Sequence, residues 1–495
     1  MLQVINFGKH RGKTWDEVMI ADRGYLEWAL KEIPHKIPAN FRKAADGPML
    51  RFNESLRGGL NNDQRQIVDL LLEGKNVIAP GIPGSGKSYI AKNFEGSIVA
   101  LAPTGVAAIN IGGQTFHSYF RISPSDLLHT LARPQPIPKS ALWILDEVFY
   151  TSATTILKVI EYIISNSEKA QFLLLGDPMQ LRPVERRDAS SQGDTEYDAD
   201  EKKQIKELKQ WKGKNVFDVL HELDIAYNIV KLETSVRHKE AATFDFMKNA
   251  RCASLTPKQL KSIPVKTETP DNCIVLAYTN EQVDTINRAG LAQFDKLTGV
   301  KITKHITNLR FPGQEITANF INNYDTNQGH RTLLLKKLKY YTRNFQEEIT
   351  AIGARVMVTK NIKSDGGHYN AVNGDTGILI ALTDKRASVM LDRTKKLIDV
   401  DSQFEGYTDR DKIWKIGITR IPIRTCYAVT IHKSQGMTIA SDLHIILNDK
   451  MAEHTGLLYT GITRTTDVAR LSVSAPLTNK MLAYDKKLFK LFQDA

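Results

Sequence analysis

Six short apolar runs, each followed directly by polar or glycine residues, constrain the fold of this chain most strongly. They are apolar throughout rather than alternating, which is typical of parallel strands buried on both faces of a sheet. In open α/β sheets, ligands bind at the carboxyl ends of the strands, where these polar residues lie. Simple turns would also be polar, but two runs end in Asp. We therefore predict an α/β fold with a ligand site at that edge; the runs read NVIAPG, IVALAPTG, LWILDE, FLLLGD, CIVLAYTN and HIILND.

The distribution of these runs predicts two α/β units in one chain. Four runs lie between Asn76 and Asp177, and the others begin at Cys273 or later. The stretch from Ser190 to Asn215 is too polar to build a core, so we expect an exposed insertion or linker there. After about residue 298 the pattern changes to alternation with Asn-Gly-Asp turn chemistry, which indicates a small antiparallel β insert.

The domain boundaries are predicted from these changes in pattern. Residues 1–55 combine the basic turn FGKHRGK with the helical pattern YLEWAL, and they form either a small appended module or a structural extension of the first domain. The predicted parts are 1–55 for the N-terminal accessory module, 56–212 for the first α/β domain with a proline-rich insert at 121–139, 213–297 with 425–495 for the second, and 298–424 for its β-rich insert.

The composition is basic, with 67 Lys and Arg against 55 Asp and Glu and a net charge of +12. Such a charge attracts polyanions, so nucleic acid is the first candidate partner, although many soluble proteins are modestly basic without binding it. Three scattered cysteines are too few for a disulfide framework or a Cys-x-x-Cys metal site. We find no signal-peptide core and no apolar run long enough to span a membrane, and we expect a cytoplasmic protein.

A phosphate-binding loop follows the first apolar run. The segment GIPGSGKS matches the pattern G-x-x-x-x-G-K-[ST] between a predicted strand and a predicted helix. The backbone N–H groups of Gly84, Ser85 and Gly86 would converge on the phosphates, Lys87 would reach the terminal phosphates, and the Ser88 hydroxyl would ligate Mg²⁺. We therefore expect a nucleoside triphosphate, with ATP and Mg²⁺ as the cofactors.

Two adjacent carboxylates close the apolar run LWIL. Asp146 would hold Mg²⁺ through water, and Glu147 would orient or deprotonate the attacking water. Two carboxylates at a strand end could instead be merely solvated, but the phosphate loop upstream favours the catalytic interpretation.

Eight further segments, taken in order, match one set of family motifs. They read LNNDQ, APTGVAA, QTFHSYF, GDPMQLRPV, LETSVR, AYTN, TIHKSQGMT and YTGITR. From about Leu60 to the C-terminal region, the chain resembles superfamily 1B DNA helicases of the RecD, Dda and Pif group. The resemblance implies two RecA-like P-loop domains with parallel sheets and a small β-rich insert in the second. The short N-terminal module at residues 1–55 lies outside the shared core. This module resembles short modules attached to some exonucleases.

The resemblance implies further residues at the nucleotide site. Gln64 would read the edge of the adenine base, and Gly436 would face the nucleotide. Arg237 and Arg464 would act as arginine fingers, because phosphoryl transfer is catalysed mainly by positioning and charge neutralisation. Without the motifs, either arginine could equally be a surface ion pair.

The segment GDPMQLRPV would join the nucleotide site to the nucleic-acid groove, again by resemblance. Asp177 would support the network of Mg²⁺ and water. Gln180 would sense the γ-phosphate and pass its presence to the groove. For Arg182, a structural ion pair and a DNA or interdomain contact are both open.

Several residues in the matching motifs are expected to grip single-stranded DNA. Hydroxyls, amides and imidazoles can bind the backbone without reading the sequence. The Phe116 ring could stack on a base, although an aromatic residue beside a strand often belongs to the core. The expected contacts are Thr104, Phe116, His117, Thr279, Asn280, Thr430, His432 and Lys433.

The activity implied by the resemblance is ATP-dependent DNA unwinding with 5′ to 3′ movement on single-stranded DNA. We expect single-stranded and forked duplex DNA as partners, replication or repair proteins as further ones, a monomer, and the cytoplasm of a bacterial or phage-infected cell. Two other activities stay open. One is a translocase that strips bound proteins without unwinding, and the other is a nucleotide-switched DNA-binding scaffold.

Overall fold

The computed structural model divides the chain into two compact units. Unit 1 comprises Met1–Val265, Thr438–Ala440 and Asn448–Ala495, and unit 2 comprises Lys266–Met437 and Ser441–Leu447. Most of residues 1–49, of the proline-rich insert and of the polar stretch before Asn215 lies outside the described residues. The structure describes residues 5, 8–14, 29, 32–33, 36, 50–121, 137–182, 210–234, 241–270, 273–311, 314–324, 328–343, 348–363, 369–408, 413–439 and 441–494.

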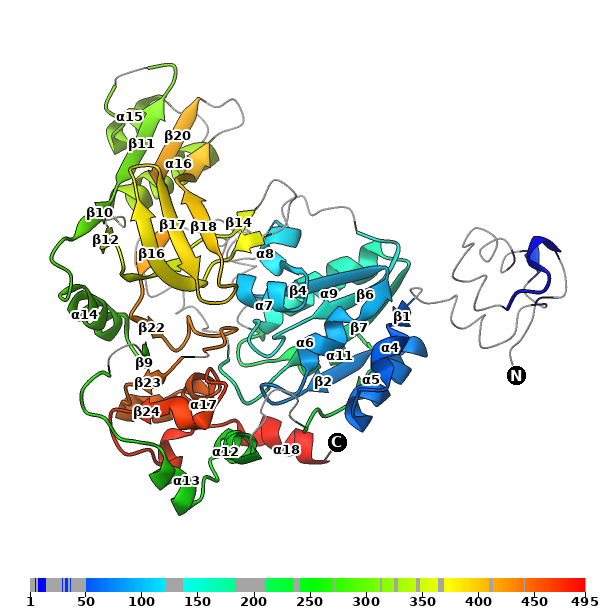
Figure 1. The fold of residues 1–495 in the computed structure, drawn as a ribbon. Helices are drawn as coiled ribbons and strands as arrows, with labels where there is room; N and C mark the ends of the chain where they lie inside the picture. The colour runs from blue at the N-terminus through cyan, green and yellow to red at the C-terminus, as the bar shows by residue number, and fades with distance from the viewer. Residues whose placement is uncertain are drawn as a thin grey trace. The chain divides into compact units, whose positions relative to one another are not determined.

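Unit 1 is built on a six-stranded sheet of order β5-β4-β6-β7-β2-β8 (Figure 1). All neighbouring strands run parallel. Every residue of β2 and the last six residues of β7 are buried. The prediction of a doubly covered parallel sheet is therefore confirmed. The strands are β2 Val77–Pro80, β4 Ile98–Ala102, β5 Gln114–Thr115, β6 Ser140–Leu145, β7 Lys169–Gly176 and β8 Asn228–Ile229.

Helices cover this sheet and complete its core. Side chains of α5, α6 and α7 pack with Leu142, Ile144, Leu173 and Leu175 in one hydrophobic cluster. The helix α9 packs on β7 and also contacts α11. A short antiparallel pair, β1 with β3, lies before and after the phosphate loop in sequence. The elements are β1 Leu50–Phe52, α4 Glu54–Arg57, α5 Asn62–Leu72, α6 Lys87–Lys92, β3 Phe94–Gly96, α7 Gly105–Asn110, α8 Phe116–Tyr119, α9 Ala153–Asn166 and α11 Val216–Glu222.

Unit 1 also contains segments on both sides of unit 2 in the sequence. The helix α12 packs on α17, and Phe492 of α18 packs against the rings of Phe149 and Phe217. Residues 213–265 and 448–495 therefore belong to the same compact unit as the six-stranded sheet. The predicted domain boundaries, which assign these residues to the second domain, stay a prediction. The elements are α12 Ala241–Arg251, α13 Pro257–Ser262, α17 Leu457–Ile462, β24 Leu471–Val473 and α18 Lys486–Asp494.

Unit 2 contains a second parallel arrangement. Strand β9, Ile274–Ala277, pairs in parallel with β22, Ala428–Thr430, and with β23, Leu443–Ile445. Helix α14, Asn280–Leu291, follows β9 and packs on it and on β22. These strands are the predicted CIVLAYTN and HIILND runs, together with the strand that enters TIHKSQGMT.

Between β9 and β22 in sequence, unit 2 forms antiparallel sheets. One has the order β18-β17-β16-β13-β21 and another the order β11-β20-β19. The region also contains α15 and α16, which pack with β20 around Trp414, Ile416 and Ile418 and which the alternating pattern did not predict. The elements are β10 Thr298–Val300, β11 Ile302–Asn308, α15 Ala318–Tyr324, α16 Gln328–Arg343, β12 Glu348–Thr350, β13 Arg355–Val358, β14 Ile362–Lys363, β15 Tyr369–Ala371, β16 Thr376–Leu382, β17 Arg386–Leu391, β18 Leu397–Asp401, β19 Gln403–Thr408, β20 Trp414–Arg420 and β21 Ile423–Thr425.

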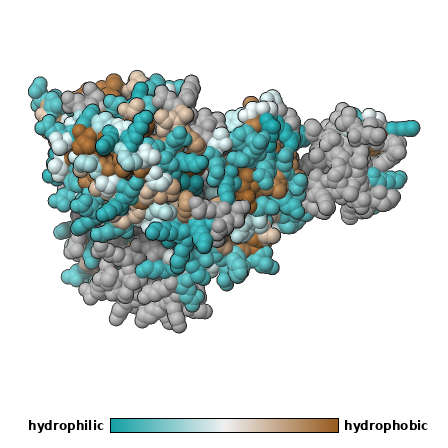
Figure 2. Space-filling view, turned by 90° about the horizontal axis from the view of Figure 1, so that it is seen from below, coloured by the Kyte–Doolittle hydropathy of each residue, from teal (hydrophilic) through white to brown (hydrophobic). Residues whose placement is uncertain are grey.

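The described surface is mostly hydrophilic in the space-filling view, with smaller hydrophobic patches between the polar residues (Figure 2). Within the described part of the chain, no helix is both long enough and apolar enough to cross a bilayer.

Candidate functional site

The phosphate loop connects the end of β2 to the start of α6. Gly84 and Gly86 have φ angles of 84° and 85°, in the left-handed region where a side chain is strained. Gly86 is also the N-cap of α6, with no side-chain cap, so the first N–H groups of this helix are left for a ligand. The loop conformation therefore explains why glycine occupies both positions.

Contacts around Lys87 hold this loop in shape. Its Nζ donates to the carbonyl oxygens of Gly81 at 2.7 Å and Ile82 at 3.0 Å. Burial lowers the pKa of Lys87, while Asp177, Glu147 and Asp146 oppose that change. The ammonium thus lies among three carboxylates at the edge of the sheet.

The predicted adenine-reading residue lies beside the same loop. Gln64 is buried, and its Nε2 donates to the Ser85 carbonyl oxygen at 3.2 Å. Its position is set by the capping box of α5, in which Asn61 and Gln64 each accept from the other's backbone N–H. The Ser85 hydroxyl is fully buried and has no hydrogen-bond partner among the described residues. An added Cβ at Gly81 would lie 2.6 Å from that hydroxyl, so the loop is closely packed.

The two carboxylates follow β6 as predicted, in an unusual conformation. Glu147 has a φ of 53°, which is uncommon for a residue with a side chain and costs energy, and such strain gathers at functional sites. Its N–H donates to Asp146 Oδ1 at 2.9 Å. Burial, and then the neighbouring Asp146, raise the pKa of Glu147 to about 7. A carboxyl group with a pKa near neutrality is suited to proton transfer.

Ser88 and Asp146 are the residues that could hold Mg²⁺. Among the described residues, no group of three or more His, Cys, Asp or Glu is arranged to hold a metal ion by itself. Mg²⁺ usually binds through one or two protein groups together with water and substrate phosphates, which fits this pair beside a phosphate loop.

The segment after β7 is held by residues in and next to α17. The Arg464 Nη2 donates to Gln180 Oε1 at 3.2 Å, and the Leu181 N–H donates to Thr460 Oγ1 at 2.8 Å. Gly456 has a φ of 76°, and a Cβ added there would lie 2.4 Å from the Gln180 carbonyl oxygen. Two predicted residues 284 positions apart in sequence are therefore in contact.

Other polar groups of this segment have contacts that the sequence did not reveal. Asp177 is paired with Arg251 at 3.2 Å and accepts a hydrogen bond from the Tyr459 hydroxyl at 2.8 Å. Arg182 forms an ion pair with Asp485, which is the structural alternative considered for it. Arg251 was not predicted from the sequence because it ends an ordinary amphipathic helix. The local signal that could have identified it is a charged residue directly after the buried positions of AATFDFMKNAR.

Three predicted DNA contacts lie in unit 1. Thr104 is the N-cap of α7, and its hydroxyl accepts from the Ala107 N–H at 3.3 Å. His117, in α8, is half-buried. Phe116 is only 1% exposed, so its burial favours the core interpretation over base stacking.

The remaining predicted contacts lie in unit 2, at one edge of its parallel strands. Thr430 pairs in register with Ala277, so the residues that follow β22 and β9 leave the same edge. Thr279 is the N-cap of α14, and Asn280 is its exposed first residue. His432 and Lys433 follow β22, and burial lowers the pKa of Lys433.

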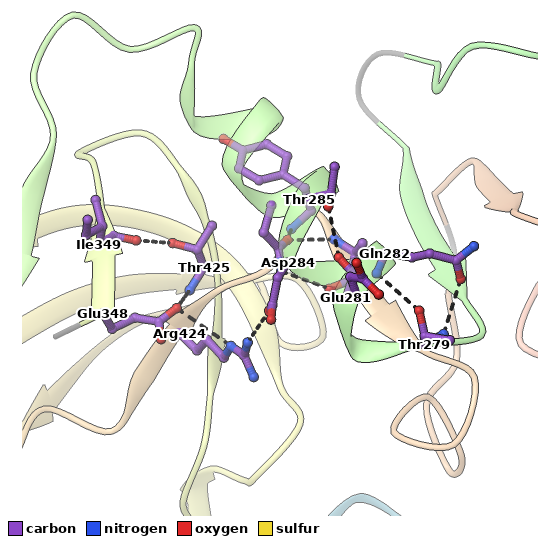
Figure 3. A network of polar contacts seen from close by, with 12 residues as sticks. Thr279, Glu281, Gln282, Asp284, Thr285, Glu348, Ile349, Arg424 and Thr425 are labelled. Carbon is purple, nitrogen blue, oxygen red and sulfur yellow. Dashed lines mark hydrogen bonds and ion pairs between the residues drawn. The ribbon is translucent and has the colours of Figure 1, made fainter. Parts of the chain in front are cut away.

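A polar network ties α14 to two strands of unit 2 (Figure 3). Arg424 Nη2 lies 2.7 Å from Asp284, and its Nε lies 3.7 Å from Glu348. The Glu348 carboxylate accepts a hydrogen bond from the Thr425 N–H, and the Thr425 hydroxyl donates to the Ile349 carbonyl oxygen. These contacts fix the orientation of the helix that carries the Thr279 cap.

Unit 1 thus brings together most of the predicted nucleotide residues. Lys87, Asp146 and Glu147 lie beside Asp177, and Gln180 contacts Arg464. Gly436, with a φ of 79°, belongs to unit 2. Arg237 lies outside the described residues.

Comparisons with known proteins agree with the order of motifs. Residues 59–243 match the family described as AAA domain, and residues 5–33 match the one described as exodeoxyribonuclease X-like C-terminal, in line with the resemblance expected for residues 1–55. The chain is 23% identical over 420 residues to the ATP-dependent DNA helicase PIF1 of Xenopus laevis, covering 79% of this chain but 58% of that protein. It therefore spans little more than half of this relative.

Two further comparisons extend along most of both chains. The ATP-dependent DNA helicase Pif1 of Campylobacter jejuni is 24% identical over 448 residues, which cover 82% of this chain and 90% of that protein. The solved structure of Pif1 helicase from Bacteroides in complex with ADP-AlF3 and ssDNA has a TM-score of 0.60 at 22% identity, covering 88% of this chain and 97% of that chain. The expected fold of two RecA-like P-loop domains is confirmed.

Proposed function

We propose that this chain, which belongs to the RecD, Dda and Pif group of superfamily 1B helicases, is an ATP-dependent DNA helicase. The observation that carries the proposal is the half-buried Glu147, whose pKa is raised to about 7, beside Asp146 and Lys87 at the end of a parallel sheet. This set combines a phosphate loop, a metal-binding carboxylate and a group able to accept a proton from water.

The chemistry follows from these residues. Gly84, Ser85 and Gly86 cradle the phosphates, and Lys87 neutralises their charge. Ser88, and Asp146 through water, would hold Mg²⁺, which would neutralise negative charge on the phosphates. Gln64 contacts the adenine.

Hydrolysis is completed by groups around the γ-phosphate. Glu147 takes the proton of the attacking water, and Arg464 stabilises the charge that develops on the phosphoryl group. Gln180, which contacts Arg464, reports the presence of the γ-phosphate. Arg237 and Gly436 complete the proposed set by resemblance.

Movement on DNA requires that the grip change during this cycle. The two RecA-like domains close when ATP binds and open when phosphate leaves, and a different affinity for single-stranded DNA in each state converts the cycle into steps. The proposed grip uses Thr104, His117, Thr279, Asn280, Thr430, His432 and Lys433. By resemblance, movement is 5′ to 3′, by a monomer in the cytoplasm that acts on forked DNA alongside replication or repair proteins.

Tailed duplexes test this function. We expect ATP-dependent opening of a duplex with a 5′ single-stranded tail and none of a duplex with only a 3′ tail. If single strands stimulate hydrolysis but neither duplex opens, the chain is a translocase that does not unwind. Tight ATP-dependent DNA binding with negligible turnover would instead identify a nucleotide-switched scaffold.

The phosphate loop is tested separately with Lys87→Ala. This variant loses the ammonium that neutralises the terminal phosphates, so hydrolysis should be abolished while some DNA binding remains. Hydrolysis is measured by phosphate release, and DNA binding by fluorescence anisotropy of a labelled oligonucleotide. Near-normal turnover would remove the nucleotide-site assignment.

A further inference from the structure

A buried ion pair connects the end of α12 to the segment that follows β7. Arg251 is the last residue of α12, and its Nη2 lies 3.2 Å from Asp177 Oδ1; their side chains are 16% and 0% exposed. We propose that Arg251 is a positioning residue, which holds the Asp177 carboxylate and the Gln180 segment in place beside the nucleotide site. The proposal rests on the proposed function, since it concerns the same site.

Three donors from different parts of the chain fix the Asp177 carboxylate. Its Oδ1 accepts from the Met179 N–H at 3.1 Å and faces Arg251, while its Oδ2 accepts from the Tyr459 hydroxyl at 2.8 Å. One donor belongs to the segment itself, one to α12 and one to α17. Because both oxygens are engaged, the carboxylate has a single defined orientation.

The charges of this cluster are stable. Burial alone lowers the pKa of Arg251. Asp177 and Tyr459 act in the opposite direction, and the net change in the pKa is upward. Burial, followed by Asp177, raises the pKa of Tyr459, so its hydroxyl keeps its proton and donates. Removing one partner of a buried ion pair leaves an uncompensated charge, which is strongly unfavourable. Arg251 therefore gives the fully buried Asp177 carboxylate a positively charged partner in direct contact, beside the Met179 N–H and the Tyr459 hydroxyl.

The cluster reaches the nucleotide site through Asp177. Among the charged groups that affect the pKa of Lys87, Asp177 has the largest effect, and Arg251 acts in the opposite direction. Both members of the pair therefore lie within electrostatic range of the phosphate-loop lysine. Asp177 also precedes Gln180 by three positions, and Gln180 contacts Arg464. A shift of the carboxylate would consequently move the proposed γ-phosphate sensor.

The test compares Arg251→Met, Asp177→Asn and the double variant by ATP hydrolysis without DNA. Misplacing a catalytic segment by about 1 Å can cost about a hundredfold in rate, so we expect each single variant to lower kcat by about tenfold or more, with KM for ATP within about twofold. If Arg251 acts through Asp177, the double variant is no slower than Asp177→Asn.

Two further variants separate positioning from loss of folding. Tyr459→Phe removes only the hydroxyl that donates to Asp177, and we expect several-fold lower kcat in a protein that still folds and unfolds cooperatively. Arg355→Met breaks a more exposed ion pair in unit 2, in which Arg355 lies 2.5 Å from Asp392 and the side chains are 19% and 37% exposed, and it should keep the wild-type kcat. If Arg251→Met does not fold, the kcat of Tyr459→Phe tests the proposal in its place.

Two results would overturn the proposal. One is a wild-type kcat in folded Arg251→Met, or in Tyr459→Phe where Arg251→Met does not fold. The other is multiplication of the Arg251 and Asp177 effects in the double variant, which would show that they act independently. A wild-type protein that does not hydrolyse ATP would instead remove the proposed function, so the two failures are distinguishable.

Discussion

At the scale of single residues, Glu147 combines a strained backbone with a perturbed carboxyl group. Its φ is 53°, and its pKa is raised from 4.5 to about 7 by burial and by Asp146. The unfolded chain loses this proton near the ordinary pKa, whereas the folded chain keeps it until about pH 7. The folded protein therefore loses stability as the pH rises through this window. The residue is costly to hold in place, which is expected where a base must be ready near neutral pH.

Glu147→Gln should separate the catalytic and stability effects. Hydrolysis should fall by about a hundredfold or more because the base is lost. In metal-free buffer, the variant should melt with the wild type near pH 4 and at a higher temperature near pH 8, because glutamine never ionises. The measurement is thermal unfolding across this range. An equal difference at both pH values would show that ionisation of Glu147 is not responsible.

At the scale of elements, helix caps position several of the proposed contacts. Thr279 accepts from the Gln282 N–H at 3.2 Å, and Gln282 reaches back to the Thr279 N–H, which forms a complete capping box at the start of α14. Thr104 caps α7 in a related way. Each of these threonines closely follows a parallel strand, so the hydrogen bond that caps the helix also holds the threonine at the carboxyl edge of the sheet, where ligands bind.

Thr279→Asp tests whether this cap also binds DNA. Aspartate is a good N-cap and suits the positive end of the helix, so the melting temperature should stay at or above that of the wild type. The added negative charge should weaken binding of single-stranded DNA by about tenfold, which corresponds to about 1.4 kcal/mol. Thr279→Ser, which keeps the cap and the hydroxyl, is the matched control. Unchanged affinity in Thr279→Asp would exclude Thr279 from the grip.

The elements also show what the sequence could predict. Strands β2, β6 and β7 were predictable because fully apolar runs and the glycines of the phosphate loop are local signals. Helices α15 and α16 were not, because alternation in the neighbouring strands dominated that region. Arg251 could not be identified, since its role depends on Asp177, which becomes its neighbour only after folding.

At the scale of the whole molecule, the charge of +12 governs how the chain meets nucleic acid. Binding of single-stranded DNA should weaken steeply as salt rises from about 50 mM to about 200 mM, because bound counterions are released. Lys433→Gln should reduce the slope of log K against log salt by about 0.7 if Lys433 contacts a phosphate. The slope is measured by anisotropy titrations. An unchanged slope would mean that Lys433 makes no such contact.

The close approach of Gly456 to Gln180 leaves no room for a side chain between two segments that are distant in sequence. A Cβ at residue 456 would lie 2.4 Å from the Gln180 carbonyl oxygen, so even alanine must push the two segments apart by the better part of a bond length. The hydrogen bond from Arg464 to Gln180 is already 3.2 Å long, so a displacement of that size would break it. A single methyl group at residue 456 therefore acts as a wedge, which would uncouple the sensor from its arginine while leaving every polar group of the site in the chain.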